Sequence, residues 1–449
     1  MSYLDLASDI VARARKQGAD EAECVVREGS QFSVNVRLGE VDQVKDSGSK
    51  AIGLRVLQGS RAATTFSSDL SEEGLDALVK SAMETVGFTS EDPFNDLPEA
   101  DQLGIAVDPA DLGLYHDDVL ALTAEQKIEM ARSAEAAALD ADPRIKNSEG
   151  GDCSSGWSQW TLANSRGFGG EYRSTHCSLS AVPVAESNGS KERDYWYSVS
   201  LNAAGLESPE EVGRRAAERT LRRLNPTKIA TTEVPIVFEP GVARSLLGHI
   251  FQAASGDSVY RHASFFADKL GEEVAGKNVT VVDDGLRPGG MGSSPFDDEG
   301  VVSRRTTIIE NGVLRSYLLN SYSARKLGLK TTGNASRGLA GSPGIGPGNF
   351  MLQPGEASPE EIIASVDRGL YVTELIGHGV NLVTGDYSRG AVGLWIEKGE
   401  LTYPVSEVTI GGNLKEIFKD IEVVGSDLDY RSAFIVPTLK IRRMTIAGK

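Results

Sequence analysis

The residues best suited to acid–base or metal chemistry in this sequence are its histidines, and their spacing excludes the commonest metallopeptidase pattern. They are His116, His176, His249, His262 and His378. No two are four positions apart, the helical spacing at which an HExxH motif places two imidazoles on one face beside a glutamate base. Gly-x-Ser-x-Gly and Walker A sequences are also absent, so neither a nucleophile elbow nor a phosphate loop is predicted. Motifs alone therefore predict no catalytic residue.

His249 lies late on a predicted helix, and two interpretations of it remain open. It is either a hydrogen-bonded histidine on a packed helix or a zinc ligand, and zinc needs two or three companion ligands. Arg244 is permanently cationic and would repel a divalent metal. Ser245 cannot replace a glutamate as general base. A rearranged metal site would have to combine His249 with His262 or His378.

Two arginines in predicted loops, Arg337 and Arg389, are candidates for binding a peptide carboxylate. We expect both to be exposed, and a surface or structural salt bridge is the alternative for each. Residues 341–348 are rich in glycine, but their prolines remove N–H donors and no Lys-Ser or Lys-Thr follows. They predict a flexible or tightly turned loop rather than a phosphate cradle.

The composition is that of a globular protein with room for two or three domains. The sequence has 449 residues, of which 40% are hydrophobic and 24% charged. A formal charge of −18 argues against a nucleic-acid-binding surface, because duplex binding depends on Lys and Arg neutralising phosphates. Cys24, Cys153 and Cys177 form no CxxC pair and predict reduced thiols. No signal peptide and no apolar run of bilayer length is recognisable, so we expect a soluble, cytoplasmic protein without membrane contact.

The first half of the sequence contains two successive units, each predicted as a helix, several strands and a second helix. Helical spacing predicts helices at 3–17 and 71–86. Between them, β-rich segments at 24–26, 32–36, 51–57 and 62–66 are separated by Gly-containing turns at 28–30, 39–40 and 58–60. The order recurs as a helix at 123–140, β-rich segments at 150–204 and a helix at 208–224. We interpret residues 1–225 as two such units, about 1–90 and 120–225, sharing one sheet and joined by a linker at about 88–122.

A second domain is expected at 232–449, after a boundary at 225–232. A strand at 234–238 and a helix at 241–254 open it, and a short helix at 359–369 has Ser358 as a candidate N-cap. The remaining Gly-rich sequence contains many short strands, at 279–282, 306–309, 314–319, 391–396, 408–410 and 439–441, a pattern typical of a curled sheet or barrel. The fold class is α+β: an N-terminal α/β region of two helix–strands–helix units, then a β-rich, barrel-like C-terminal domain.

Several segments in order resemble the TldD/PmbA family, weakly through 1–225 and strongly beyond 232. They include Val281-Val282-Asp283-Asp284-Gly285, Phe296-Asp297-Asp298-Glu299-Gly300, Thr332-Gly333-Asn334 and Thr384-Gly385-Asp386-Tyr387-Ser388-Arg389-Gly390-Ala391, with further matches at 309–314, 349–355, 403–407 and 412–414. The segments at 403–407 and 412–414 are closer to the PmbA (TldE) branch than to TldD. The resemblance implies a cytosolic two-component peptidase that degrades unfolded or small peptides.

In this family a TldD-type subunit binds zinc through HExxxH plus a late cysteine, and a TldE-type subunit lacks the site. By position, the motif falls on Arg244 for the first histidine, Ser245 for the glutamate and His249 for the second histidine. No cysteine follows Cys177, so the late ligand has no counterpart. The resemblance thus implies a subunit without its own cofactor, a dimer with a TldD-like partner that carries the zinc, and no catalytic residue here.

The three degenerate positions are either peptide contacts or packed side chains. A rival interpretation is a non-enzymatic regulatory or interaction protein of the gyrase-modulator type, since early names of family members described them as gyrase modulators. Such a protein could act as a homodimer. Presence of a second homologous chain with an intact HExxxH would favour the two-component peptidase.

Overall fold

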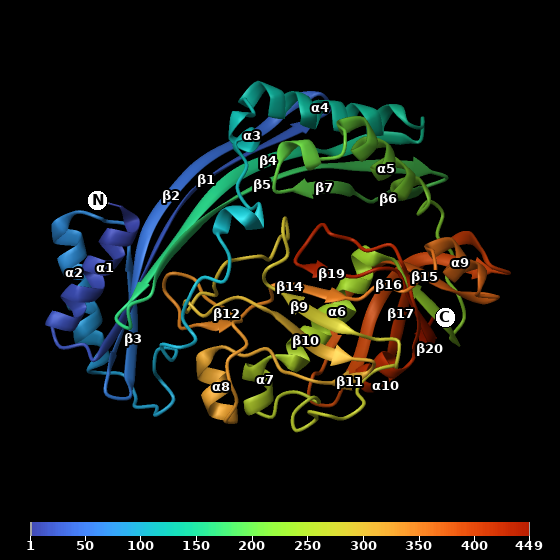
Figure 1. The fold of residues 1–449 in the computed structure, drawn as a ribbon. Helices are drawn as coiled ribbons and strands as arrows, with labels where there is room; N and C mark the ends of the chain where they lie inside the picture. Colours follow the sequence, from blue (N-terminus) through green and yellow to red (C-terminus); the bar gives the residue numbers. More distant parts are fainter. Residues whose placement is uncertain (1, 449) are drawn as a thin grey trace.

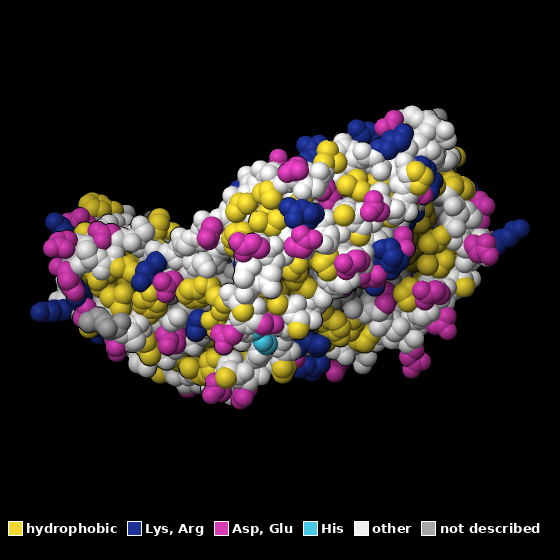
Figure 2. Space-filling view, turned by 90° about the horizontal axis from the view of Figure 1, so that it is seen from above, with side chains coloured by type: hydrophobic (Ala, Val, Ile, Leu, Met, Phe, Trp, Pro, Cys, Tyr) yellow, Lys and Arg dark blue, Asp and Glu magenta, His cyan; other side chains and the backbone are white. Residues whose placement is uncertain are grey.

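The structure is a computed structural model that describes residues 2–448. An arched antiparallel sheet carries helices on its outer side, and a body built from the second half of the chain lies beneath the arch (Figure 1). Seen from above, acidic and basic side chains intermingle over the outer face instead of gathering into one basic surface (Figure 2). Between residues 2 and 448, no helix combines the length and the apolarity that crossing a membrane requires.

One seven-stranded sheet joins the two N-terminal units, as predicted. Its order is β3-β2-β1-β4-β5-β6, with β7 also pairing with β5, and all pairs are antiparallel. The junction is the pairing of β1 with β4, which runs from Glu23 opposite Asn164 to Val36 opposite Gly151. The strands are β1 (Glu21–Arg37), β2 (Glu40–Gln58), β3 (Arg61–Ser67), β4 (Ile145–Asn164), β5 (Gly169–Ser187), β6 (Ser190–Arg193) and β7 (Trp196–Ser200).

The predicted turn at 28–30 is wrong, because β1 runs through it without interruption. A Cβ on Gly29 would lie 2.5 Å from the carbonyl oxygen of Trp157 on β4. The glycine is therefore needed for close approach of the neighbouring strand and not for a turn. The expected turn at 39–40 does form, where Leu38 and Gly39 take positive φ values of 51° and 81°, the geometry of a tight hairpin.

Four long helices cover the outer face of the sheet. Helices α1 (Tyr3–Lys16) and α2 (Glu72–Val86) pack on the first unit, and α4 (Ala124–Asp140) and α5 (Pro209–Leu221) on the second (Figure 1). On β1 the side chains alternate: Val26 points to the core under α1 and α2, whereas Val25 joins Phe296 of the C-terminal body. The sheet is thus buried on both faces where the two halves of the chain meet.

The segment 88–122, predicted as a loop or linker, is packed and not free. It contains only the short helices η1 (Pro109–Leu112) and α3 (Asp117–Ala121). Leu97 and Leu112 are fully buried, and Leu103 forms a β-bridge with Val301. The segment therefore ties the arch to the body beneath it.

The C-terminal region contains a closed five-stranded barrel, which agrees with the predicted barrel-like domain. Strands follow the order β17-β16-β15-β8-β20, and pairing of β17 with β20, Ile410 opposite Ile446, closes the ring. Strand β18 (Ile421–Val424) attaches to β20 outside the ring. The barrel strands are β8 (Thr232–Phe238), β15 (Arg368–Val380), β16 (Asp386–Glu397), β17 (Glu400–Asn413) and β20 (Leu439–Ala447).

A second, open sheet has the order β11-β10-β9-β14-β19 and shares one hydrophobic core with the barrel. Helix α9 starts with the predicted Ser358 cap, whose side chain and Glu361 form a capping box, but it ends at Ala364 because the chain turns into β15. The remaining elements are η2 (Ala203–Gly205), α6 (Pro240–Ala254), α7 (Gly256–Tyr260), β9 (Val281–Asp284), β10 (Arg305–Glu310), β11 (Val313–Leu314), α8 (Ser321–Leu327), β12 (Ala335–Ser336), β13 (Gly344–Ile345), β14 (Asn349–Leu352), α9 (Pro359–Ala364), α10 (Leu414–Lys419) and β19 (Phe434–Ile435).

Candidate functional site

Helix α6 turns Arg244 and Ser245 away from the C-terminal core, whereas His249 packs against the core residue Tyr387. The helix follows barrel strand β8 directly, and Pro240 at its first position suits a helix start because its missing N–H would have no intrahelical partner there. The opposite side is apolar and buried, through Val242, Leu246, Leu247, Ile250 and Ala253. Burial of that face fixes which way Arg244 and Ser245 point.

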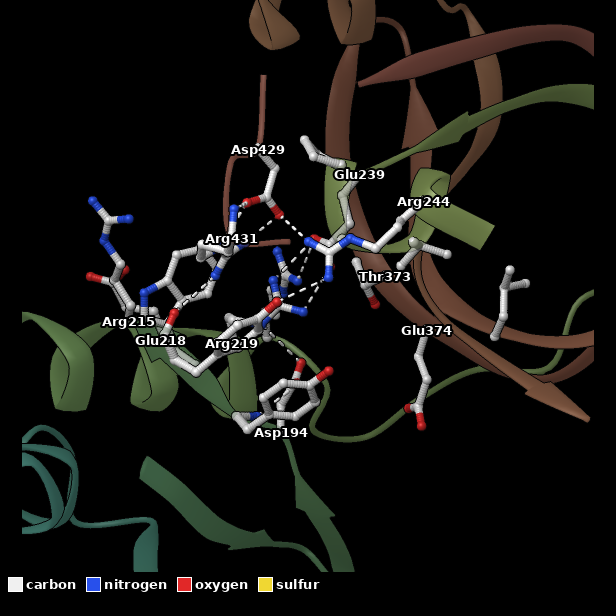
Figure 3. A pocket seen from close by; sticks show the side chains of 18 of the residues that line it. Asp194, Arg215, Glu218, Arg219, Glu239, Arg244, Thr373, Glu374, Asp429 and Arg431 are labelled. Carbon is white, nitrogen blue, oxygen red and sulfur yellow. Dashed lines mark hydrogen bonds and ion pairs between the residues drawn. The ribbon is translucent and has the colours of Figure 1, made fainter. Parts of the chain in front are cut away.

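Arg244 is held by an acidic and a phenolic partner. Its Nη2 donates to Oδ2 of Asp429 at 2.8 Å, and its Nη1 donates to the hydroxyl of Tyr197 at 3.1 Å. Asp429 is shared, because Nε of Arg431 donates to its Oδ1 at 2.9 Å (Figure 3). Burial alone would raise the pKa of Asp429, but the hydrogen bonds and charge of Arg431, helped by Arg244, hold it below its usual value. The carboxylate is therefore ionised at neutral pH.

The other two positions of the helix differ in how they are satisfied. The hydroxyl of Ser245 donates back to the carbonyl of Val242 at 2.9 Å. Neither ring nitrogen of His249 forms a hydrogen bond, and its ring packs edge-to-face on Tyr387 with centroids 6.1 Å apart. Burial lowers the pKa of His249, the charge of Arg389 lowers it further, and the nearby Gln252 opposes this only in part. The imidazole is neutral at pH 7.

The donor set at this helix does not fit a zinc ion. Zinc sites in proteins use three or four Cys, His or carboxylate ligands. Here His249 is the one imidazole, and the side chain five residues before it is a guanidinium already paired with Asp429. His262 is largely exposed beside Asp268, and His378 is exposed on β15. Within residues 2–448 no three or more His, Cys, Asp or Glu side chains are grouped as metal ligands.

A cavity of about 1160 Å³ opens beside the start of α6, between the arch and the body. We call it the arginine-rich cavity. Its walls are α5 and β7 from the arch, and α6, β15, β16 and the loop 427–431 from the body. Figure 3 shows Arg244, Asp429 and Arg431 meeting at this cavity. Arg244 and Ser245 line it, whereas His249 does not. Nine arginines and seven carboxylates line the cavity in a protein whose net charge is −18.

Ion pairs between these charges join the two halves of the chain. Glu239, the residue before α6, accepts from Arg219 at 2.7 Å and from Arg222 at 3.1 Å, both at the end of α5. Arg223 reaches Glu374 on β15 at 2.6 Å. Because the acidic partners lie on the body and the arginines on the arch, the cavity wall is also the joint between them.

The two arginines that were predicted to lie in exposed loops have different surroundings, and the loop prediction is wrong for Arg389, which lies in β16. The expected exposure of Arg337 is wrong: its side chain is 3% exposed, and its Nη1 lies 2.7 Å from Oε1 of Glu23, which is fully buried on β1. The salt-bridge alternative describes this arginine, since the sheet and the body close over it. Arg389 is half-buried on β16 and lines the arginine-rich cavity. Its guanidinium has no carboxylate within 4.0 Å among residues 2–448.

The acidic motif segments gather at a second cavity of about 330 Å³. Asn334 donates from Nδ2 to Oδ2 of Asp283 at 2.6 Å, and Asp297 accepts the backbone N–H groups of Val301 and Ala335 at 2.9 Å each. Burial raises the pKa of Asp283 to about 6. The hydrogen bonds of these carboxylates connect separate loops, so the acidic segments stabilise the local structure of this chain.

Several residues of the arginine-rich cavity belong to no motif that the sequence shows, above all Tyr197, Asp429, Arg431 and Glu239. Asp429 and Arg431 are two positions apart, which could have suggested a local ion pair. No sequence signal connects that pair to Arg244, which lies 185 positions away.

Domain models of one family match most of the chain. The PmbA/TldA metallopeptidase domain 1 matches residues 22–86, the central domain matches 117–224 and the C-terminal domain matches 231–448. A solved structure named as a candidate modulator of DNA gyrase from Bacteroides thetaiotaomicron superimposes with a TM-score of 0.92 at 28% identity, covering 99% of this chain and 98% of that one. The structure of TldE from Thermococcus kodakarensis superimposes with a TM-score of 0.89 over 98% of this chain and 99% of that one. At 22% identity it demonstrates the shared fold.

The sequence is 41% identical over 431 residues to a protein named metalloprotease PmbA from Escherichia coli O157:H7, covering 96% of this chain and 93% of that protein. Together with the three domain models, this identity places the chain in the PmbA/TldD metallopeptidase family, in its PmbA branch.

Proposed function

We propose that this chain is the TldE/PmbA-like subunit of a cytosolic two-component zinc metallopeptidase, and that a TldD-like partner carries the catalytic zinc. The observation that carries the proposal is the ion pair between Arg244 and Asp429, 2.8 Å long. It lies at the position where the resemblance puts the first histidine of HExxxH. A guanidinium there repels a divalent cation, and the site retains one imidazole of the ligands that zinc needs.

The role of such a subunit is to complete the peptidase chamber and to hold the partner in its active geometry. Unfolded or small peptides are the substrate class. A peptide held as an added β-strand gains main-chain hydrogen bonds without a demand on its sequence. Arg244 then acts as part of the chamber wall, because its charge is already neutralised by Asp429.

The test compares this chain alone with this chain co-expressed with a TldD-like chain from the same genome. Zinc content and hydrolysis of an unstructured peptide are measured after size-exclusion chromatography. We expect one complex containing both chains, with zinc and hydrolysis in the complex only. A partner variant without the HExxxH glutamate controls for contaminating proteases. Stoichiometric zinc and turnover by this chain alone would refute the proposal.

The second candidate function is a non-enzymatic regulatory or interaction protein. It is favoured by the name of the Bacteroides thetaiotaomicron structure, a candidate modulator of DNA gyrase. This candidate predicts a homodimer whose mass does not change when a TldD-like chain is added. The same chromatography therefore separates the two candidates.

A further inference from the structure

Arg389 is the one arginine of the arginine-rich cavity, within the described residues 2–448, that has no carboxylate partner. The other eight each lie within 4.0 Å of an Asp or Glu oxygen. The recorded polar contact of Arg389 is from Nη2 to the carbonyl of Leu375 at 3.5 Å, at the limit for a hydrogen bond, and its buried Nε has no partner. A guanidinium has five N–H donors, so most of its donor capacity is free.

The groups behind Arg389 supply no negative charge. His249 and Tyr387 are the neighbours whose pKa values its charge affects, and both are uncharged at neutral pH. Their polar ring and hydroxyl atoms are buried without hydrogen-bond partners. Neither His249 nor Tyr387 lines the arginine-rich cavity, so a ligand there would contact Arg389 and not these two groups. The open side of Arg389 is the cavity that it lines.

The remaining charges of the cavity restrict the kind of anion that fits. Eight of its nine arginines are already paired with carboxylates, which leaves little uncompensated positive charge for a polyanion such as a polyphosphate. One unpaired guanidinium matches one negative charge, and its planar fork suits a carboxylate. At about 1160 Å³ the cavity is far larger than a single small ion and is of the size that holds an organic ligand. Tyr195, Trp196 and Tyr197 add aromatic surface for side chains.

We propose that the arginine-rich cavity binds the C-terminal carboxylate of a peptide, with Arg389 donating the charge-assisted hydrogen bonds. The choice of a peptide as the ligand rests on the proposed function, whereas the preference for a single carboxylate rests on the charges of the cavity. This chain would then anchor the end of a peptide whose cleavage takes place on the partner subunit.

The test uses the unaltered chain, without a partner. Isothermal titration calorimetry compares an acetylated four-residue peptide carrying a free C-terminus with the same peptide as its C-terminal amide. We expect the free acid to bind at least about tenfold more tightly, as the loss of a charge-assisted hydrogen bond implies. Equal affinity of the acid and the amide, or binding of neither, would overturn the proposal. Inorganic phosphate is the competitor; displacement of the peptide by phosphate at the peptide's own concentration would equally overturn it.

Variants then locate the site. Arg389→Gln should weaken binding of the free acid by at least about tenfold and leave the amide unchanged, and Arg389→Lys should retain part of the preference because it keeps the charge. Arg315→Gln removes an exposed arginine that pairs with Glu310 at 3.0 Å outside the cavity, and it should bind like the parent. Undiminished binding by folded Arg389→Gln would contradict the assignment. If that variant does not fold, the comparison of the free acid with the amide on the parent still tests whether this chain prefers a free carboxylate.

The outcome is separable from that of the proposed function. Absence of a zinc-containing complex would refute the two-subunit peptidase without affecting the carboxylate preference measured on this chain alone. Absence of that preference would refute the cavity assignment and leave the complex intact.

Discussion

Arg337 and Glu23 lie 314 positions apart in the sequence, and their side chains meet at 2.7 Å inside the protein. Oε1 of Glu23 also accepts from Nη1 of Arg55 at 2.9 Å, and all three side chains are almost fully buried. Glu23 belongs to the arch and Arg337 to the body. One buried carboxylate therefore receives an arginine from each half of the chain.

We expect Arg337→Ala to destabilise the protein by about 1–3 kcal/mol, because Glu23 keeps Arg55 but loses a buried charge-assisted hydrogen bond. Arg315→Ala, which breaks the exposed pair with Glu310, should have little effect. Thermal denaturation followed by circular dichroism measures both. The triple variant Glu23→Gln, Arg55→Met and Arg337→Met should be less damaged than Glu23→Gln alone, since it removes the whole buried charge cluster and leaves neither arginine without its carboxylate. Equal melting temperatures for Arg337→Ala and Arg315→Ala would contradict a contribution of this pair to stability.

The raised pKa of Asp283, about 6, predicts a specific pH dependence of stability. In the folded state the carboxyl keeps its proton to higher pH than in the unfolded chain, where its pKa is 3.8. The folded state thus binds more protons at Asp283 between these values, and the contribution of this group to stability falls as pH rises from about 4 to about 6. Asp283→Asn cannot titrate, so its stability relative to the parent should increase across this interval by at most about 3 kcal/mol.

Urea denaturation at several pH values between 4 and 7 checks this prediction. Asp268→Asn is the control, because Asp268 has an 86% exposed side chain. Its curve should run parallel to that of the parent. A parallel curve for Asp283→Asn as well would mean that burial does not shift this carboxyl.

The shared acceptor Asp429 predicts an order of effects at the arginine-rich cavity. Asp429→Ala leaves Arg244 and Arg431 both without their carboxylate, whereas Arg244→Ala leaves Asp429 still paired with Arg431. We expect Asp429→Ala to be the more destabilising, by roughly 1–3 kcal/mol, because it orphans two charged donors. Chemical denaturation ranks the two, and the reverse order would show that Arg244 and not Asp429 organises the loop 427–431.

Restoring the degenerate motif predicts a gain of metal binding. In Arg244→His with Ser245→Glu, the repelling guanidinium is removed and a second imidazole joins His249 on the same helix. We expect this double variant to retain some zinc after dialysis, more weakly than a complete site, because the late cysteine is still lacking. Ser245→Glu alone should retain none. Zinc is measured by atomic absorption, and adding His249→Ala to the double variant should abolish the gain; zinc that survives this third change would lie elsewhere.

Local patterns in the sequence predicted the helix caps, the tight turns and the buried faces of helices, which depend on interactions between residues close together in the chain. Ser358 and Glu361 lie three positions apart and form the capping box of α9, and Gly39 turns the first hairpin. The apolar spacing from Val242 to Ile250 predicted α6 and its buried face. In each case the interacting groups are within a few residues of each other, so spacing alone carries the information.

Only the tertiary structure decided which distant groups meet. Pairing of Ile410 with Ile446 closes the barrel, and Gly29 serves the approach of β4, although the same residue suggested a turn. Arg337 was expected at the surface and is buried against Glu23, whereas Arg389 is left without a carboxylate at a cavity wall. The sequence determined the helix that carries Arg244 and the absence of a full HExxxH. Its partner Asp429 follows from the docking of two halves of the chain, which depends on the packing of both cores at once and not on any local spacing.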